Sequence, residues 1–390
     1  MSKKRSYQAS HPWIKFELDL RRLGHETWML LGEARSKIEH VCGVPLLPHV
    51  AAKLLRMYLA KGAAATTAIE NNTLTEQEVN KLIEGELHLP PSREYLGQEV
   101  ANIIDACKEI SFKLTTGEPT TLDVKLIKQY NANVLHNLPP KPDVQPGKIR
   151  EHSVGVGSYR GAPAEDCEFL LQRLCEWIDG EAFESASIDK ISFALLKAIV
   201  AHIYIAWIHP FGDGNGRTAR LVEYHILLSA GVPLTSAHLL SNFYNQTRSE
   251  YYRQLDISHR SGGDIFDFLF YALQGFVDGI KEELNEIRDE QMRVHWINYI
   301  HRMFKHKESE ADMRRRRLIL DLTDVEEAVP MHDLPHITPR VAGLYANKQI
   351  RTLQRDVQYL EDLWLIRRTK DRIQANEELM QAFLSPKRRD

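Results

Sequence analysis

Apolar residues recur at helical intervals through most of the chain. Within residues 12–112, which we expect to be mostly helical, the spacing of Phe16, Leu20, Leu23, Leu30 and Ala34 fits one face of a helix. The same pattern predicts helices over 49–65, from 75, over 94–112, from 122, and over 165–178, 188–208, 221–228, 250–259 and 265–287. We therefore expect a mainly α fold.

Two stretches interrupt the helical pattern. The run Pro139-Pro140-Lys141-Pro142 predicts a stiff linker, and the β-branched residues and glycines of 149–160 predict a short hairpin. Residues 308–317 are highly charged and end in four arginines, which indicates a linker or an exposed helix start.

The last part of the chain has a different pattern. An apolar run over 318–322 is followed by a segment over 338–346 and then by a further helix. That helix is expected to place four apolar residues on one face: Ile350, Leu353, Val357 and Leu360. Residues 365–368 and Ile373 predict a two-stranded wing, so the pattern is typical of a winged helix-turn-helix.

Composition adds few constraints. The chain has 390 residues, 43% hydrophobic and 26% charged, with a net charge of -3, so any nucleic-acid or membrane contact must be a local patch. The cysteines lack Cys-x-x-Cys spacing, so we expect buried, reduced thiols and a cytoplasmic location: Cys42, Cys107, Cys167 and Cys175. The sequence predicts no signal peptide, and no apolar run is expected to reach the length of a membrane span.

The segment between the predicted helices 188–208 and 221–228 concentrates polar chemistry. It reads His209-Pro210-Phe211-Gly212-Asp213-Gly214-Asn215-Gly216-Arg217-Thr218-Ala219-Arg220. Gly214 and Gly216 leave backbone N–H groups bare at a helix N-terminus, where the partial positive charge favours phosphate. The segment therefore predicts a helix, a tight phosphate-binding loop and a second helix.

The charged residues of this segment suit phosphate transfer. Arg217 and Arg220 are three positions apart, so both project from one helix face and can clamp phosphate oxygens. Asp213 is suited to hold Mg²⁺ that bridges phosphates, and a neutral His209 can take a proton from a hydroxyl. Positioning, charge neutralisation and a base are most of what such a transfer needs.

Each of these residues also has a plainer explanation. The glycine spacing resembles a dinucleotide-binding loop, but such a loop follows a strand, and this one follows a predicted helix. The glycines alone can be turn residues, Arg217 and Arg220 a solvated helix face, and His209 a core histidine. Together, however, the residues favour a nucleotide-transfer site.

The complete segment resembles the Fic motif, His-x-Phe-x-Asp/Glu-Gly-Asn-Gly-Arg-x-x-Arg, with every defined position filled. The resemblance extends over most of residues 60–285. Fic enzymes are helical and typically move AMP from ATP to a protein hydroxyl, releasing pyrophosphate. The resemblance therefore implies a Fic helical core with a small β-hairpin flap, followed by the winged helix-turn-helix, and a protein adenylyltransferase that uses ATP and Mg²⁺.

The resemblance also assigns roles by position. His209 is expected to be the general base for a target Ser, Thr or Tyr hydroxyl, and Asp213 the Mg²⁺ ligand. Arg217 is expected to contact the β-phosphate and Arg220 the γ-phosphate. Other loop residues are expected to line the anion site (Gly214, Asn215 and Gly216) or to anchor the loop in the core (Phe211). Doc-type kinases of the same fold carry Lys at the place of Gly216, so nucleotidyl transfer is favoured.

The stretch Thr66-Thr67-Ala68-Ile69-Glu70-Asn71 resembles the Fic inhibitory motif, Ser/Thr-x-x-x-Glu-Gly/Asn. The alternative is an ordinary helix C-terminus capped by Asn71. In the inhibitory reading, Glu70 pairs with Arg220 and displaces the γ-phosphate, which holds ATP in an unproductive pose. Glu70 is then also a candidate to orient a water that removes AMP from a modified target.

Two further features fit the family. The stretch Val154-Gly155-Val156 resembles the Fic flap, which docks the target by strand addition, and the alternative is a plain surface hairpin. Tyr251 and Tyr252 resemble the paired tyrosines near the adenine pocket of related enzymes, and the alternative is aromatic core packing.

These interpretations give a four-part division of the chain. It comprises an N-terminal helical region with the inhibitory helix over 1–110, a Fic core over 111–290, a linker or helix over 291–317 and the winged helix over 318–390. The expected partner is a target protein with an acceptor hydroxyl, without a membrane. The sequence leaves open the target, the oligomeric state, a homo-oligomer included, and donors such as UTP or GTP.

The predicted winged helix raises a second hypothesis, a DNA-binding regulator whose Fic core senses nucleotide. Lys348, Arg351 and Arg355 are expected on the polar side of its recognition helix, where they can meet phosphates. Nearby acidic residues are expected to dilute this charge: Asp356, Glu361 and Asp362. Packing or dimerisation is the alternative use of such a domain.

Overall fold

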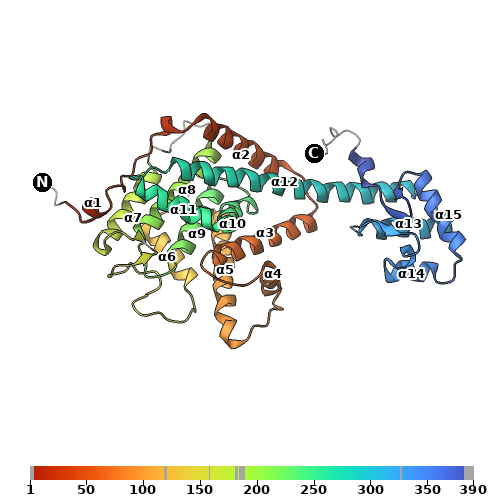
Figure 1. The fold of residues 1–390 in the computed structure, drawn as a ribbon, viewed down its shortest axis with the longest axis horizontal. Coiled ribbons are helices and arrows are strands. Elements are labelled where there is room, and N and C mark those ends of the chain that lie inside the picture. Colours follow the sequence, from red (N-terminus) through yellow and green to blue (C-terminus); the bar gives the residue numbers. More distant parts are fainter. Residues whose placement is uncertain are drawn as a thin grey trace. The chain divides into compact units, whose positions relative to one another are not determined.

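In a computed structural model the chain forms two compact units, Met1–Leu284 and Asn285–Asp390. The structure describes residues 4–117, 121–157, 159–180, 183, 189–325 and 327–381. Both units are mainly helical, with a few short strands, which confirms the predicted fold class (Figure 1). The finer division into four parts stays a prediction.

The first unit is built from helices, most of them at the predicted places. They are α1 (Tyr7–Ser10), α2 (His25–Gly43), α3 (Pro48–Ala68), α4 (Glu76–Glu84), α5 (Glu94–Thr115), α6 (Val124–Val134), α7 (Ala164–Ile178), α8 (Lys190–Ile208), α9 (Asn215–Ser229), α10 (Leu239–Gln246) and α11 (Arg248–Arg260). Helix α12 (Phe266–Met303) begins in this unit and ends in the second. Helix α4 starts with the capping box of Thr75 and Glu78.

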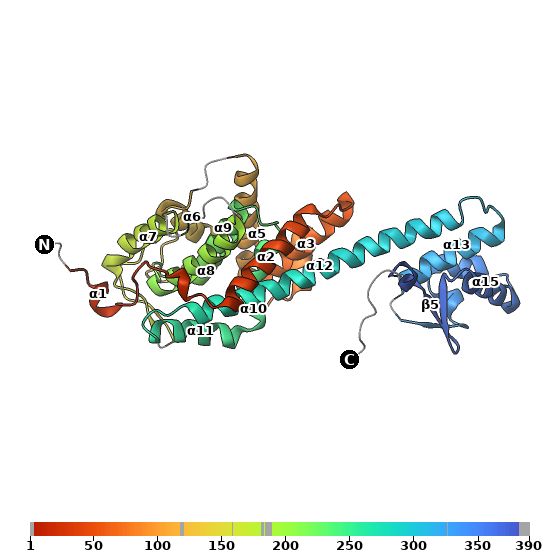
Figure 2. The same cartoon turned by 90° about the horizontal axis from the view of Figure 1, so that it is seen from above.

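Helices α8 and α9 form the centre of this unit. They pack against each other, α2 and α7 cover α8, and α3, α5 and α6 cover α9. Figure 2 shows α8 and α9 side by side, with α6 and α7 on one side and α10 and α11 on the other. The loop that joins α8 to α9 is therefore held at both ends by core helices.

Helix α8 overturns one expectation from the sequence. Its 19 residues contain an 18-residue stretch with a mean hydropathy of 1.9, which is long and apolar enough to cross a membrane, so an apolar run does reach that length. Of this stretch, 78% is buried inside the protein, which accounts for its composition without a lipid phase. Cys42 departs from expectation too, because it is exposed, whereas Cys107, Cys167 and Cys175 are buried, and all are free thiols.

The predicted hairpin is present but very short. Strand β1 (Gly155–Val156) pairs antiparallel with β2 (Tyr159–Arg160), and Val156 lies opposite Tyr159. The turn uses Gly157, whose φ of 56° is costly for residues other than glycine. An isolated bridge between Ile149 and Phe211 joins the approach to this hairpin to the loop after α8.

The second unit combines helices with a small sheet. The helices are α13 (Glu310–Thr323), α14 (Pro339–Tyr345) and α15 (Ile350–Asp362), and the antiparallel sheet has the order β3 (Val329–Pro330), β5 (Arg372–Ala375), β4 (Ile366–Thr369). Strands β4 and β5 form the predicted two-stranded hairpin after α15. The assignment as a winged helix stays a prediction.

Three residues of the second unit lie where the sequence pattern did not place them. Ile350 is 56% exposed at the first position of α15, whereas Leu353, Val357 and Leu360 are buried as expected. Asp356 is buried, so it does not dilute the charge of the exposed face. Arg314, expected in a linker or an exposed helix start, is buried in α13 beside Asp356. The pairing of these two opposite charges explains both burials.

Candidate active site

The loop between α8 and α9 is fixed by its own backbone geometry. His209 caps α8 with a left-handed φ of 49°, and its N–H still donates to the Ile205 carbonyl (2.8 Å). Gly214, with φ 76°, ends the loop, and α9 begins directly at Asn215, earlier than the apolar pattern indicated. The glycine conformation turns the chain so that the first N–H groups of α9 face the loop.

The side chain of Asn215 closes this loop. Its Oδ1 accepts from the Phe211 N–H (2.9 Å) and its Nδ2 donates to the Phe211 carbonyl (2.8 Å). Phe211 is 1% exposed, which confirms the predicted anchor. Because both ends of the Asn215 amide bind backbone, this residue shapes the anion loop rather than offering its amide to a ligand.

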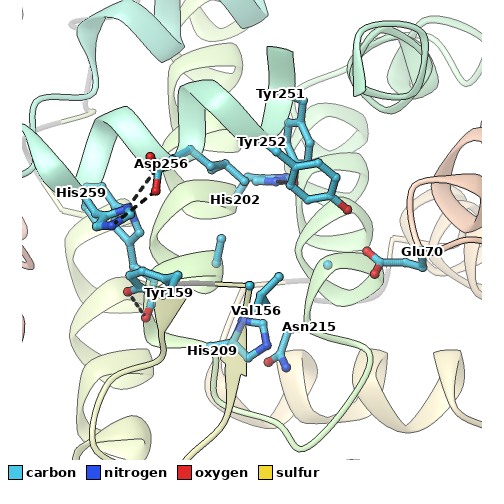
Figure 3. Close-up of a pocket in the computed structure, with 15 residues that line it drawn as sticks. Glu70, Val156, Tyr159, His202, His209, Asn215, Tyr251, Tyr252, Asp256 and His259 are labelled. Atoms are coloured by element: carbon cyan, nitrogen blue, oxygen red, sulfur yellow. Dashed lines mark hydrogen bonds and ion pairs between the residues drawn. The ribbon is translucent and has the colours of Figure 1, made fainter. Parts of the chain in front are cut away.

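A cavity of about 440 Å³ opens beside the loop. Its lining residues include Glu70, Val156, Gly157, Tyr159, His202, Ala206, Trp207, His209, Asn215, Gly216, Tyr251, Tyr252, Leu255, Asp256 and His259. Figure 3 shows His209 and Asn215 on one side of this space, Tyr251 and Tyr252 opposite, and Glu70 at one end. A volume of this order is typical of sites for small molecules and cofactors.

His209 is set up to be neutral. Burial lowers its pKa to about 4, an effect that a backbone hydrogen bond with Ala206 opposes and the charge of Arg150 reinforces. At neutral pH the imidazole therefore holds no extra proton and can accept one. His209 thus lines the cavity as a neutral imidazole.

The two arginines of the loop face away from solvent and are paired with carboxylates. Arg217 Nη1 lies 3.0 Å from Glu99 Oε1, and Arg220 Nη2 lies 2.7 Å from Glu70 Oε1. Arg220 also donates to the Thr66 carbonyl (2.9 Å). The side chains of Arg217 and Arg220 are 4% and 1% exposed, whereas those of Glu99 and Glu70 are 16% and 35% exposed, so the guanidinium groups are shielded from water and the Glu70 carboxylate is partly open to it.

Asp213 is likewise engaged by neighbours. Its carboxylate lies 2.6 Å from Lys141 Nζ and accepts from the Gly214 N–H (2.8 Å). Burial alone would raise the pKa of Asp213, but the hydrogen bond from Lys141 and the charge of Arg217 outweigh it and lower the pKa. The group is therefore a carboxylate at neutral pH.

An ionised Asp213 fits the predicted magnesium ligand. Within the described part of the chain, no group of three His, Cys, Asp or Glu side chains is arranged to hold a metal. Mg²⁺ bound through one carboxylate and substrate phosphates does not require such a group. The donor set therefore suits a metal that arrives with a nucleotide, and not one bound by protein alone.

Glu70 is brought to the loop by the end of α3. Helix α3 stops at Ala68, and Asn71 adopts a left-handed φ of 73°. Helix α11 supports this end, because Arg248 donates to Asn71 Oδ1 (2.7 Å) and the Tyr252 hydroxyl donates to the Ile69 carbonyl (3.1 Å). The expected pairing of Glu70 with Arg220 is present, and the helix C-terminus with Asn71 at its end is also real.

Gly216 allows Glu70 to approach the loop. A Cβ built on Gly216 would lie 2.2 Å from Glu70 Oε1, which is far inside contact distance. Although burial opposes ionisation, the Arg220 guanidinium holds the pKa of Glu70 below its ordinary value. The carboxylate therefore stays charged and seated over the N-terminal turn of α9 at neutral pH.

The two tyrosines of the predicted pair differ in burial. Tyr251 is 3% exposed, stacks on Tyr244 (4.9 Å between ring centroids) and bonds to His202 Nε2 through its hydroxyl (2.8 Å), so core packing applies to it. Tyr252 is 39% exposed. Both rings line the cavity, which agrees with the predicted place near a nucleotide base.

The flap residues are divided between cavity and solvent. Val156 lines the cavity and is 50% exposed, and Val154 and Gly155 lie outside the cavity lining. Tyr159 opposite Val156 anchors the hairpin through a hydrogen bond from its hydroxyl to the Trp207 carbonyl (2.7 Å). The hairpin thus borders the cavity close to His209.

Some site residues were not predicted from the sequence. Glu99, Lys141 and Arg150 contact Arg217, Asp213 and His209, respectively. Each is distant in sequence from its partner, and none of them was assigned a role in the site from the sequence. Neither the helical pattern around Glu99 nor the proline-rich run around Lys141 indicates a contact with the loop, because these contacts form only in the tertiary fold.

Comparison with known proteins agrees with this geometry. Residues 121–227 match the family model described as Fic/DOC family. Protein adenylyltransferase fic-1 of Caenorhabditis elegans is 28% identical over 229 residues, 57% of this chain and 42% of that protein. The Caenorhabditis briggsae protein of the same name is 30% identical over 208 residues, 53% of this chain and 38% of its own. Residues 121–227 therefore resemble the Fic/DOC family, and the chain spans less than half the length of these relatives.

Solved structures show the same fold. A Fic family protein from Desulfovibrio desulfuricans G20 has a TM-score of 0.56 at 21% identity, covering 90% of this chain and 96% of that one. Residues 134–508 of Fic-1 from C. elegans give a TM-score of 0.52 at 23% identity, covering 66% of this chain and 71% of that one. At these identities the two structures show a likeness of fold alone.

Proposed function

We propose that this protein is a Fic-type protein adenylyltransferase that moves AMP from ATP to a Ser, Thr or Tyr hydroxyl of a target protein and of itself. The observation that carries the proposal is a neutral His209 that lines a nucleotide-sized cavity together with Asn215 and Gly216, the first two residues of α9. The names of the relatives, protein adenylyltransferase fic-1, support the same reaction.

The reaction needs one proton acceptor and strong charge neutralisation. The hydroxyl oxygen bonds to the α-phosphorus of ATP, the bond from that phosphorus to the bridging oxygen breaks, and pyrophosphate leaves. The hydroxyl proton passes to the His209 imidazole. A bound Mg²⁺ would neutralise phosphate charge, and Asp213 is the residue suited to hold it.

Arg217 and Arg220 are proposed to take the β- and γ-phosphates, and the N–H of Gly216 to face the phosphate chain. The Gly214 N–H, expected to be bare, instead donates to the Asp213 carboxylate (2.8 Å). The small Gly216 supports nucleotidyl transfer in preference to the phosphoryl transfer of Doc-type kinases. The Tyr251 and Tyr252 rings are proposed to bound the base, and the Val154–Val156 strand to pair with the target backbone.

The enzyme is proposed to be restrained by Glu70. The γ-phosphate needs the Arg220 guanidinium, and the Glu70 carboxylate lies 2.7 Å from it. A carboxylate paired with the buried Arg220 guanidinium competes directly with a phosphate oxygen for the same donor. ATP can then bind only in a pose that lacks this contact, which slows transfer.

Labelling with α-labelled ATP and Mg²⁺ tests the proposal. Self-labelling or labelling of lysate proteins is expected to rise in Glu70→Gly and to vanish in Glu70→Gly/His209→Ala. Absence of α-phosphate labelling in Glu70→Gly, with the protein folded, would refute the enzyme hypothesis. Parallel reactions with UTP and GTP establish the donor.

The reverse direction is a proposal at the same site. Glu70 lines the cavity together with His209, so its carboxylate can orient a water towards an AMP-modified target. Release of AMP from such a target is expected to be lost in Glu70→Ala. Release that survives this substitution would remove Glu70 from the reverse reaction.

A second candidate function is DNA binding by the second unit, and one observation favours it. Asp356 is turned inward, where its two oxygens accept from Arg314 (2.7 Å) and Arg315 (2.7 Å). The exposed face of α15 and its approach therefore carry Lys348, Arg351 and Arg355 without that acidic residue. Such a face can meet phosphates and base edges.

A gel shift with genomic fragments at several salt concentrations tests the second candidate. Triple substitution of the surface cations Lys348, Arg351 and Arg355 by Ala is expected to remove a salt-dependent shift. Arg367→Ala is the control, because that arginine is also exposed but pairs with Glu378 (2.7 Å). Unchanged mobility of wild type at low salt would exclude this function.

A further inference from the structure

Arg150 is a buried arginine that joins the loop after α8 to the hairpin. It is 4% exposed. Its Nε donates to the His209 carbonyl (2.8 Å) and its Nη2 to the Ile208 carbonyl (3.4 Å). On the hairpin side, Nη1 donates to the His152 carbonyl (2.6 Å) and Nη2 to the Ala162 carbonyl (2.5 Å).

The backbone of Arg150 strengthens the same connection. Its N–H donates to the Pro210 carbonyl (3.0 Å), next to the bridge between Ile149 and Phe211. Side chain and main chain of one residue therefore bind three successive residues, Ile208, His209 and Pro210. The last carbonyls of a helix lack partners within that helix, so a cation at this place satisfies them and suits the negative end of the helix dipole.

His209 needs such support because of its backbone conformation. Its φ of 49° lies in the left-handed region, which residues with a Cβ adopt only where the surroundings hold them. Gly161 adds a second restraint, since a Cβ there would lie 2.7 Å from His209 Cβ and 2.9 Å from Arg150 Nη2. The hairpin end, the guanidinium and the base thus fit together at close range.

We propose that Arg150 is a positioning residue for AMP transfer, which holds His209 in its left-handed conformation and fixes it to the hairpin that borders the cavity. This inference rests on the proposed function. Arg150 contacts the backbone of His209 and not the cavity, whose lining within the described residues does not include it. It therefore acts through the base.

The charge of Arg150 has a second consequence for the base. A cation close to His209 disfavours the imidazolium, and Arg150 is one of the groups that lower the pKa of His209. Glu70 and Asp213 act in the opposite direction. The other titratable groups lining the cavity are Tyr159, His202, Tyr251, Tyr252, Asp256 and His259. Removing only the guanidinium should therefore raise the pKa of His209.

The test compares Arg150→Met and Arg150→Lys in the Glu70→Gly chain. Met removes the charge and all donors, and Lys keeps the charge but cannot reach the same set of carbonyls. We expect kcat to fall about 10- to 100-fold in Arg150→Met and less in Arg150→Lys, with KM for ATP within about twofold. In the Glu70→Gly/His209→Ala chain, Arg150→Met should have no further effect.

Histidine NMR titration of the full chain supplies a readout that does not depend on activity. The His209 ring signal, assigned from His209→Ala, is expected to titrate near pH 4 in the parent and at higher pH in Arg150→Met, with Arg150→Lys close to the parent. An unchanged titration in Arg150→Met, or equal losses in kcat and ATP affinity, would overturn the proposal.

The two proposals fail in distinguishable ways. If the Glu70→Gly chain with Arg150 intact labels nothing, the proposed enzyme function fails, although the NMR titration still tests the Arg150–His209 connection. If Arg150→Met does not fold, as judged by circular dichroism, the Lys variant decides. The positioning role would be contradicted if a folded Arg150→Lys chain kept full kcat while the pKa of its His209 was raised.

Discussion

The two sides of the α8–α9 loop differ in what occupies them. On one side, His209 and Gly216 line a cavity of about 440 Å³. Each charged group of the loop, in contrast, has a partner from elsewhere in the chain: Asp213 with Lys141, Arg217 with Glu99, and Arg220 with Glu70, which itself lines one end of the cavity. The base is thus accessible, while the groups proposed to bind phosphates and metal are paired.

This difference suggests separate roles for the two groups of residues, with His209 suited to proton transfer and the paired arginines suited to regulation of ATP binding. A neutral base needs only access and a fixed orientation, and both are present. Under the proposed function, phosphate binding needs the guanidinium donors of Arg217 and Arg220, and these groups pair here with the carboxylates of Glu99 and Glu70. We infer that the resting state is limited by its anion side, so substitutions on the two sides should have opposite effects on transfer.

The largest effect is expected on the base side. His209→Ala in the Glu70→Gly chain should lower kcat about 10²- to 10⁴-fold, which is the usual contribution of a positioned general base. Single-turnover labelling with α-labelled ATP measures the rate. ATP affinity, measured by calorimetry, should be unchanged, and a loss of affinity equal to the loss of rate would show that His209 binds and does not catalyse.

The anion side should respond in the opposite direction. Glu70→Gly is expected to raise transfer about 10- to 100-fold, because a charge-assisted contact from Arg220 becomes available to ATP. Glu70→Gln, which keeps the shape of the side chain but loses its charge, should give an intermediate gain. Equal rates for Glu70, Gln and Gly at this position would eliminate the inhibitory role.

The same Glu70→Gly substitution should also change stability. Arg220 is 1% exposed and would lose its carboxylate partner, which is unfavourable for a buried charge. The apparent melting temperature is therefore expected to fall without nucleotide and to recover when ATP and Mg²⁺ are added.

The sequence predicted the residues of the loop itself better than the distant residues that pair with them. The residues from His209 to Arg220 lie within one turn-and-helix segment, so their proximity follows from local structure. The placement of Glu70 beside Arg220 spans 150 positions and followed only from the resemblance to a family motif. Glu99 and Lys141 belong to no such motif, and their contacts depend on how α5 and the proline-rich segment pack.

In the second unit, too, the apolar pattern predicted the helix but not the surroundings of every residue in it. The apolar period located α15 and placed Leu353, Val357 and Leu360 in the core. It also assigned Ile350 to that face, although the first turn of the helix extends past the core and leaves this residue exposed. Periodicity gave Asp356 a polar position, and only its pairing with Arg314 and Arg315 explains why it is buried.

A smaller effect is expected from Glu99. Its Oε1 pairs with Arg217 (3.0 Å) and its Oε2 accepts from Asn72 Nδ2 (2.9 Å), close after Glu70 in the chain. Glu99→Gln should lower KM for ATP about fivefold with little change in kcat, as expected for weakening one charged hydrogen bond.

The matched control for this substitution lies on the same helix. Glu109→Gln removes a carboxylate of α5 that pairs with Lys113, away from the loop. It should leave KM unchanged. An equal effect of both substitutions would show that helix stability, and not the freedom of Arg217, sets the affinity.

The smallest effect concerns pH. A histidine with the ordinary pKa of 6.5 would lose its base form progressively below that pH, whereas burial lowers the pKa of His209 to about 4. The neutral imidazole is therefore populated above pH 4 and depleted below it.

Since kcat/KM reports the free enzyme, its value in the Glu70→Gly chain should change less than about twofold between pH 5.5 and 8. Glu70 raises the pKa of His209, so its removal favours the neutral base further. A fall in kcat/KM centred near pH 6.5, measured with Mg²⁺ saturating and ATP well below KM, would mean that the His209 imidazole keeps its ordinary pKa and that burial does not lower it in the working enzyme.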